Sequence, residues 1–164
     1  MTLITELEQL DLNQTYSYAD YLTLQIQEAT PFDVRLYDRK KSLLKNQDIH
    51  TVVQPDICVV CQPEEKLDKQ GCNGALDWII EILSKGTAKR DVHVKYQLYQ
   101  ESGVTEYWLV FPGDQIIDQF VLNDSGKYEL KQKYTHDDIA IPYLFPELAM
   151  DVNEIFDTWA GGLS

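Results

Sequence analysis

The sequence predicts an α/β fold in which a mixed sheet of about five or six strands is flanked by helices. The apolar run from Trp78 to Leu83 is typical of a buried strand. A helical stretch, Thr87 to Ser102, follows it, and turn signals at Pro112 to Asp114 and Asn123 to Gly126 separate three further strands. A strand, a crossover helix and an antiparallel meander together define this architecture.

The composition indicates one ordinary globular domain over residues 1–164. The chain has 44% hydrophobic and 25% charged residues, enough to bury a core without disulfides. Three cysteines, no signal-peptide pattern and no apolar run near the ~20 residues of a membrane span lead us to expect a cytoplasmic protein with no membrane partner.

The charge is strongly acidic overall but unevenly distributed. A formal net charge of -13 argues against a general nucleic-acid coat protein. Of the 14 Lys and Arg residues, however, five lie between Arg35 and Lys45 and four between Lys85 and Lys95. Local cationic patches are therefore compatible with the acidic total, and we expect any DNA contacts in these two segments.

The N-terminal third predicts little regular structure before its first strand. Residues 1–14 form a loose acidic lead-in, and Thr15 to Leu22 predicts a short helix with Ser17 as a candidate N-cap. Phe32 to Tyr37 alternates apolar and charged residues, which predicts a strand with one solvated face, and the charged stretch Asp38 to Asn46 is its loop.

A second strand is expected from Thr51 to Cys61. Pro55 interrupts it, and because proline cannot donate to a sheet ladder it predicts a bulge or an edge just before Asp56. A polar loop, Gln62 to Asn73, then leads to the apolar strand.

The C-terminal half contains clear boundaries. Gly103 ends the helix at its C′ position, and the next strands are Thr105 to Phe111, Gln115 to Leu122 and Lys127 to Tyr134. A final amphipathic helix, Val152 to Trp159, can be capped by Asp151.

One buried strand carries an acid. Glu81 lies inside the apolar run, and a carboxylate there needs either a hydrogen-bonded partner or a chemical role. Because strand side chains alternate, Asp77, Ile79 and Glu81 share one face. Asp56 follows the Pro55 bend and Lys95 lies on the next helix; two carboxylates for Mg²⁺ and a lysine to stabilise charge are the parts of a metal-dependent phosphodiesterase.

Four ordered segments resemble the family of predicted restriction endonucleases, formerly a domain of unknown function, within the PD-(D/E)XK nuclease superfamily. The resemblance covers roughly the C-terminal three quarters of the chain. The segments are residues 53–60, residues 74–84, residues 87–91 with Lys95 and Tyr99, and residues 103–110.

The resemblance implies a restriction-endonuclease-like fold and a nuclease site. Asp56 and Glu81 match the metal ligands, Lys95 matches the catalytic lysine, and Asp77 matches an additional acid of less defined role. The parent pattern places its lysine two residues after the glutamate, where this chain has Leu83; relatives of this kind supply it from the following helix. A hairpin, an acidic motif and a long helix that the family has after its first helix are absent between residues 24 and 31.

Each of these residues has an alternative explanation. Glu81 could be a hydrogen-bonded structural acid, Asp56 could begin a turn, and Lys95 could form a solvated ion pair with Asp91 one helical turn earlier. A zinc or redox site at Cys58, Cys61 and Cys72 is not favoured, because residues three apart on a strand face opposite sides.

The remaining candidate groups favour structural roles. His50, His93 and His136 are scattered without metal-ligand spacing. The aromatic group Tyr96, Tyr99, Tyr107 and Trp108 is expected to pack between helix and sheet.

Two hypotheses follow. The first is an endonuclease that uses Mg²⁺, with Mn²⁺ as a substitute, and contacts DNA through Lys85, Lys89 and Arg90. The second is an inactive nuclease-fold module for nucleic-acid or protein binding. Since the central strands are apolar on both faces and the family's long helix is missing, we also expect a homodimer that covers the second face.

Overall fold

The structure is a computed structural model that describes residues 33–38, 40, 44–69, 71–84, 86 and 89–160. The expected lead-in and the short helix with Ser17 lie outside these residues. The chain divides into two compact units, one formed by residues 1–54 and 62–75 and the other by residues 55–61 and 76–164. In the described part of the chain no helix is long and apolar enough to cross a membrane.

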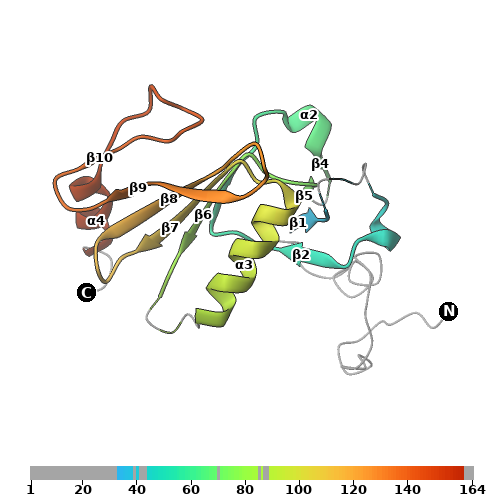
Figure 1. Cartoon of the computed structure of the whole chain (residues 1–164), viewed down its shortest axis with the longest axis horizontal. Helices are drawn as coiled ribbons and strands as arrows, with labels where there is room; N and C mark the ends of the chain where they lie inside the picture. The colour runs from blue at the N-terminus through green and yellow to red at the C-terminus, as the bar shows by residue number, and fades with distance from the viewer. Residues whose placement is uncertain are drawn as a thin grey trace. The chain divides into compact units, whose positions relative to one another are not determined.

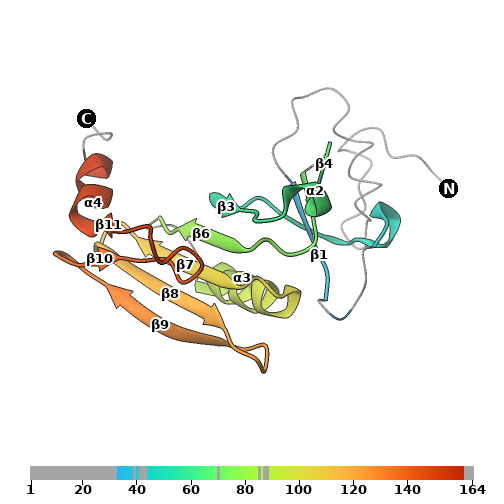
Figure 2. The ribbon, with the colours of Figure 1, turned by 90° about the horizontal axis from the view of Figure 1, so that it is seen from above.

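The second unit contains a mixed five-stranded sheet in the order β3-β6-β7-β8-β9. Figure 1 shows β6 to β9, and Figure 2 adds β3 beside β6. β6 and β7 are parallel, and the other neighbouring pairs are antiparallel. The predicted mixed α/β architecture is thus confirmed. The strands are β3 (Ile57–Val59), β6 (Trp78–Ile82), β7 (Glu106–Phe111), β8 (Ile116–Leu122) and β9 (Tyr128–Tyr134).

Helix α3 (Lys89–Ser102) makes the crossover between the two parallel strands. It ends as predicted at Gly103, whose φ of 90° suits glycine. The N–H of Val104 donates to the carbonyl of Tyr99 and that of Gly103 to the carbonyl of Gln100, which is the Schellman arrangement. The helix end is therefore fixed directly after the residues that face the sheet.

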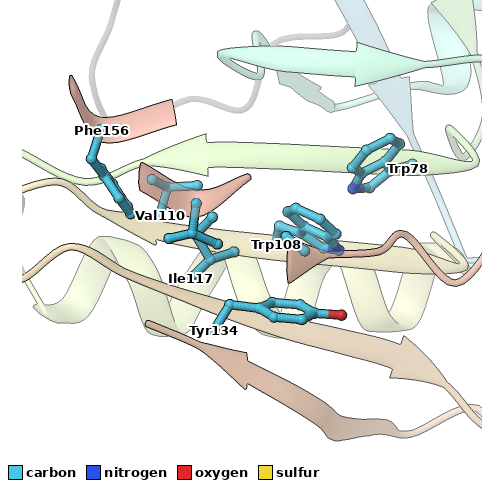
Figure 3. Close-up of a cluster of buried hydrophobic side chains, with 8 residues drawn as sticks. Trp78, Trp108, Val110, Ile117, Tyr134 and Phe156 are labelled. Atoms are coloured by element: carbon cyan, nitrogen blue, oxygen red, sulfur yellow. The ribbon is translucent and has the colours of Figure 1, made fainter. Parts of the chain in front are cut away.

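The C-terminal segment covers the other face of the sheet. Helix α4 (Val152–Ala160) follows β11 (Met150–Asp151), which pairs with β10 (Ile139–Ala140) (Figure 2). Asp151 caps α4 as predicted, accepting a hydrogen bond from the N–H of Asn153 at 2.8 Å. Figure 3 shows the apolar cluster that results, formed by Trp78, Trp108, Val110, Ile117, Tyr134, Ala140, Val152 and Phe156.

The second apolar face of the central strands is covered within the chain, contrary to the expectation that a partner subunit is needed for this. Trp78, Trp108 and Val110 are buried by α4, β10 and β11. The cover comes from the C-terminal segment, whereas a helix before residue 31 was the expected source. The homodimer itself stays a prediction.

The first unit has a four-stranded sheet in the order β2-β1-β5-β4. It also includes a short 3-10 helix, η2 (Asn46–Asp48), and helix α2. The segment predicted as a polar loop, Gln62 to Asn73, in fact contains α2 (Pro63–Lys66), β4 (Leu67–Asp68) and β5 (Gly71–Asn73).

Two strand predictions are corrected in this region. The run from Thr51 to Cys61 is two strands in different sheets, β2 (Thr51–Val53) and β3, because the chain turns at Pro55 and Asp56 by more than a bulge. β1 (Asp33–Leu36) has no solvated face, because all four of its residues are buried; it is an inner strand, between β2 and β5.

Candidate active site

Glu81 is buried on β6 and bonded through both carboxylate oxygens. It is 4% exposed. The hydroxyl of Tyr99 donates to Oε1 at 2.6 Å, and the ammonium group of Lys95 donates to Oε2 at 2.8 Å. A buried carboxylate is costly unless it is paired and hydrogen-bonded, and here both conditions are met.

The connection from β6 to α3 brings these three residues together. Tyr99 follows Lys95 by four residues, so the two side chains lie on the same side of α3 one turn apart. Glu81 is one of the alternate residues of β6 that face this helix, whereas Trp78 joins the cluster on the opposite face. Lys95 and Glu81 form an ion pair at 2.8 Å, whereas the side chain of Asp91 lies outside the described residues.

Tyrosine rings form the packing around Glu81. The ring of Tyr99 lies 5.1 Å from that of Tyr107, and the ring of Tyr96 lies 5.2 Å from that of Tyr128. Burial raises the pKa of the Tyr99 hydroxyl well above its ordinary value, and the Glu81 carboxylate beside it raises this pKa further. Tyr99 is therefore a protonated donor throughout the neutral pH range.

One member of the predicted aromatic group lies elsewhere. Trp108 packs on the opposite face of the sheet, with its ring 5.0 Å from that of Trp78. The reason is strand alternation: Tyr107 and Trp108 are consecutive in β7 and must point to opposite faces.

Asp56 lies at the start of β3, beside the residue that follows Glu81. Its Oδ2 accepts a hydrogen bond from the backbone N–H of Ile82 at 2.7 Å. The β3–β6 register begins with the pairing of Ile57 and Ile80, so Asp56 lies in the bend just before the paired residues of β3. The Asp56 bond to the Ile82 amide ties this bend to the end of β6 that carries Glu81.

Asp77 lies at the other end of β6. Its Oδ2 accepts a hydrogen bond from the backbone N–H of Cys61 at 2.7 Å, which ties the end of β3 to the start of β6. Four residues of extended strand separate Asp77 from Glu81 by about 13 Å. This contact favours a structural role for Asp77 over a share in one ion with Glu81.

The basic residues expected to contact DNA differ in their exposure to solvent. Lys89 is exposed at the start of α3. Lys85 lies outside the described residues, as does the side chain of Arg90. Arg35, which the charge pattern placed in a surface patch, is buried at 1% exposure and forms a 2.7 Å ion pair with Asp68, so it is not a surface contact.

A second buried acid was missed from the sequence. Glu106, at the start of β7, is fully buried and accepts hydrogen bonds from Trp108 Nε1 at 2.6 Å and Gln119 Nε2 at 2.7 Å. The backbone N–H groups of Tyr143 and Leu144 also donate to it, both at 2.9 Å. Its position in an apolar strand could have indicated from the sequence that this acid is buried. Its hydrogen bonds show that it anchors the segment after β10.

The donor set fits a hard divalent cation with water ligands. In the described part of the chain no three His, Cys, Asp or Glu side chains gather to hold a metal. Mg²⁺ needs only one or two protein carboxylates when it keeps several waters, and the Glu81 carboxylate is one candidate ligand. The ammonium group beside Glu81 Oε2 shows that a cation can be accommodated at that oxygen.

These features together define a restriction-endonuclease-like domain: a mixed sheet, a crossover helix, and a buried carboxylate on the strand before that helix, paired with a lysine from the helix. The model of the Uma2 family, described as "putative restriction endonuclease", matches residues 18–153. This chain belongs to that family.

One solved structure is similar to this chain, a crystal structure described as a putative nuclease belonging to DUF820 from Anabaena variabilis. The identity is 20% and the TM-score 0.49, over 66% of this chain. The match spans 62% of that protein's chain. No curated protein matches.

Proposed function

We propose that this protein is a metal-dependent DNA endonuclease that hydrolyses phosphodiester bonds. The observation that carries the proposal is the buried Glu81 carboxylate on β6 with Lys95 at 2.8 Å from Oε2. Family membership supports the reaction class.

The roles follow from the chemistry of each group. Glu81 Oε2 and the Asp56 carboxylate would hold Mg²⁺, or Mn²⁺ in its place, which when bound supplies charge to a phosphate oxygen and acidifies a water. Lys95 is 38% exposed, so its ammonium group can leave Oε2 and place a positive charge beside a phosphate. Positive charge aimed at the developing negative charge lowers the barrier without further reorganisation.

DNA is the proposed substrate, with Lys89 as a backbone contact and Lys85 and Arg90 as further candidates. Lys89 is exposed, as a phosphate contact must be. We also retain the homodimer as a proposal, because an enzyme that cuts two antiparallel strands suits a two-fold axis. Sedimentation equilibrium at micromolar concentration tests it: a mass of 19.0 kDa would be the monomer.

An inactive binding module is the second candidate, and a specific observation favours it. Glu81 is bonded at both oxygens and Asp56 to the Ile82 amide, so both acids have structural contacts without an ion. Such a protein would keep the fold and bind nucleic acid or protein without cleaving.

A plasmid assay separates the two. The wild-type protein should convert supercoiled plasmid to nicked or linear DNA with Mg²⁺ or Mn²⁺ and not with EDTA. The Glu81→Ala variant should lose several kcal/mol of transition-state stabilisation, about a thousandfold in rate. Cleavage by this variant at the wild-type rate would refute the proposed site, and no cleavage by either protein would favour the binding module.

A further inference from the structure

The Tyr99 hydroxyl differs from the other tyrosine hydroxyls around it. The Tyr96 and Tyr128 hydroxyls donate to backbone carbonyls, at 3.4 Å and 2.8 Å. The Tyr107 hydroxyl is buried without a hydrogen-bond partner among the described residues. Tyr99 alone in this described group donates to a charged side chain, at 2.6 Å from Glu81 Oε1.

The two oxygens of Glu81 have different environments. Oε1 meets a fully buried, uncharged donor on a ring that is packed against Tyr107. Oε2 meets a long, partly exposed and charged side chain that can move away. One oxygen is therefore held and the other can exchange its cation.

We propose that Tyr99 is a positioning residue for the metal site: it fixes the Glu81 carboxylate through Oε1, so that Oε2 is presented to the divalent ion. This inference rests on the proposed function. A neutral donor suits the task, since it satisfies one oxygen without cancelling the negative charge that attracts the ion. A second cation at Oε1 would cancel that charge.

We expect the Tyr99 hydroxyl to pre-organise the Glu81 carboxylate for metal binding. If Oε1 lost its donor, the carboxylate would be free to rotate about its last torsion and to engage Lys95 with both oxygens. The divalent ion would then compete with a stronger Glu81–Lys95 ion pair, and the Glu81 carboxylate would be a less ordered metal ligand. Groups that orient metal ligands typically contribute 10–100-fold to affinity or activity.

Tyr99→Phe tests this, with Tyr96→Phe as the matched control. Both variants remove one hydroxyl from α3, three residues apart, but only the first removes a bond to Glu81. Mn²⁺ affinity is measured by titration calorimetry, and plasmid cleavage gives kcat and KM. Tyr99→Phe should weaken Mn²⁺ binding about 10–100-fold. It should lower kcat by a larger factor than it changes the KM for DNA. Tyr96→Phe should change Mn²⁺ affinity and kcat by less than about twofold.

A spectroscopic readout uses the wild-type protein and so does not depend on the variant folding. With ¹³Cζ-labelled tyrosine, addition of Mg²⁺ should shift the Tyr99 resonance, because its acceptor shares charge with the ion, and leave the Tyr96 resonance in place. The two resonances are assigned from the two variants, or from a paramagnetic Mn²⁺ series if Tyr99→Phe does not fold.

The outcomes separate this inference from the proposed function. If the wild-type protein binds no Mn²⁺ and cleaves no DNA, the proposed function fails and the inference with it. If the wild-type protein binds Mn²⁺ but Tyr99→Phe equals Tyr96→Phe, or the Tyr99 resonance does not respond to Mg²⁺, the metal site stands and the positioning role of Tyr99 is wrong.

Discussion

The two faces of the five-stranded sheet are built from the same strands but have opposite chemistry. On the face toward α3, a buried acid, a lysine and several tyrosine hydroxyls form a polar site within an aromatic shell. On the face toward α4, Trp78, Val110 and Phe156 form an apolar cluster (Figure 3). Consecutive residues of β6 and β7 supply both, so strand alternation separates the proposed chemistry from the main apolar support.

Because the two kinds of residue lie on opposite faces, substitutions should be able to separate stability from activity. Changes on the α4 face should lower stability without altering the activity of the folded protein, and changes at Lys95 should do the reverse.

Trp108→Ala should cost about 3–5 kcal/mol of unfolding free energy. The side chain is 2% exposed, and its ring packs on Trp78 and Tyr134. Urea denaturation followed by circular dichroism measures the loss, and Trp108→Phe should lose less. Cleavage per folded molecule should be unchanged; a large fall in kcat would show that the two faces are not independent.

Alkaline pH should unfold the protein through the tyrosines of the α3 face. Burial raises the pKa of Tyr99, Tyr107 and Tyr128 above the ordinary value of 10.0. Since the folded-state pKa is raised, their contribution to stability is complete below pH 10 and is lost as the pH rises above it. Between pH 9 and 11 each tyrosine accounts for an average decline of about 0.7 kcal/mol per pH unit, or about 2 for three, because the unfolded tyrosine is only half ionised at pH 10.

Denaturant midpoints between pH 9 and 11 measure that slope, and Tyr99→Phe should reduce it by about one third. The ultraviolet absorbance of tyrosinate provides an independent test. Ionisation of these tyrosines near pH 10 in a protein that stays folded would contradict the tight burial of this face.

Lys95→Met should lower cleavage about 100–1,000-fold, the usual effect of removing one donor aimed at developing charge. Because Lys95 is 38% exposed, its ion pair is partly screened, and the unfolding free energy should fall by only about 1 kcal/mol. Steady-state cleavage rates and urea midpoints check the two values. A wild-type rate in this variant would leave Lys95 as a structural partner of Glu81.

Lys89→Gln should have the smallest effect. It should weaken DNA binding and reduce the slope of log affinity against log salt by about 0.9, the value for one phosphate contact. Fluorescence anisotropy across a salt series measures this, with Lys131→Gln on β9 as an exposed control. Equal slopes in both variants and the wild type would show that Lys89 is only a solvated side chain.

Local patterns predicted most of the second unit. The Asn123 turn, the Gly103 helix end and the Asp151 cap each depend on residues within one or two turns of chain, and all three are present. The approach of Lys95 to Glu81 was also predictable, because a helix that directly follows a strand packs back onto it.

Long-range pairing explains what could not be predicted. The charged Asp33 and Arg35 predict a half-solvated strand, yet both are buried. Their polar partners, Gln54 and Asp68, are distant in sequence. The Thr51 to Cys61 run gives no local sign that its two halves join different sheets. The hydrogen bond from Tyr99 to Glu81 depends on which side of α3 faces β6. The four-residue spacing between Lys95 and Tyr99 could have suggested that both side chains lie on that side.

The seven residues from Pro55 to Cys61 belong to the second unit although both neighbouring stretches of chain belong to the first. A contiguous fragment that contains the whole second unit must therefore begin at Pro55 and include residues 62–75 of the first unit. A fragment beginning at Leu76 would retain Glu81 and Lys95 but lose Asp56 and β3. The apolar strand β6 would then be left as an unpaired edge, a known template for aggregation. A fragment that begins at Pro55 keeps Asp56 and β3 with Glu81 and Lys95, and it carries residues 62–75 of the first unit as an insertion.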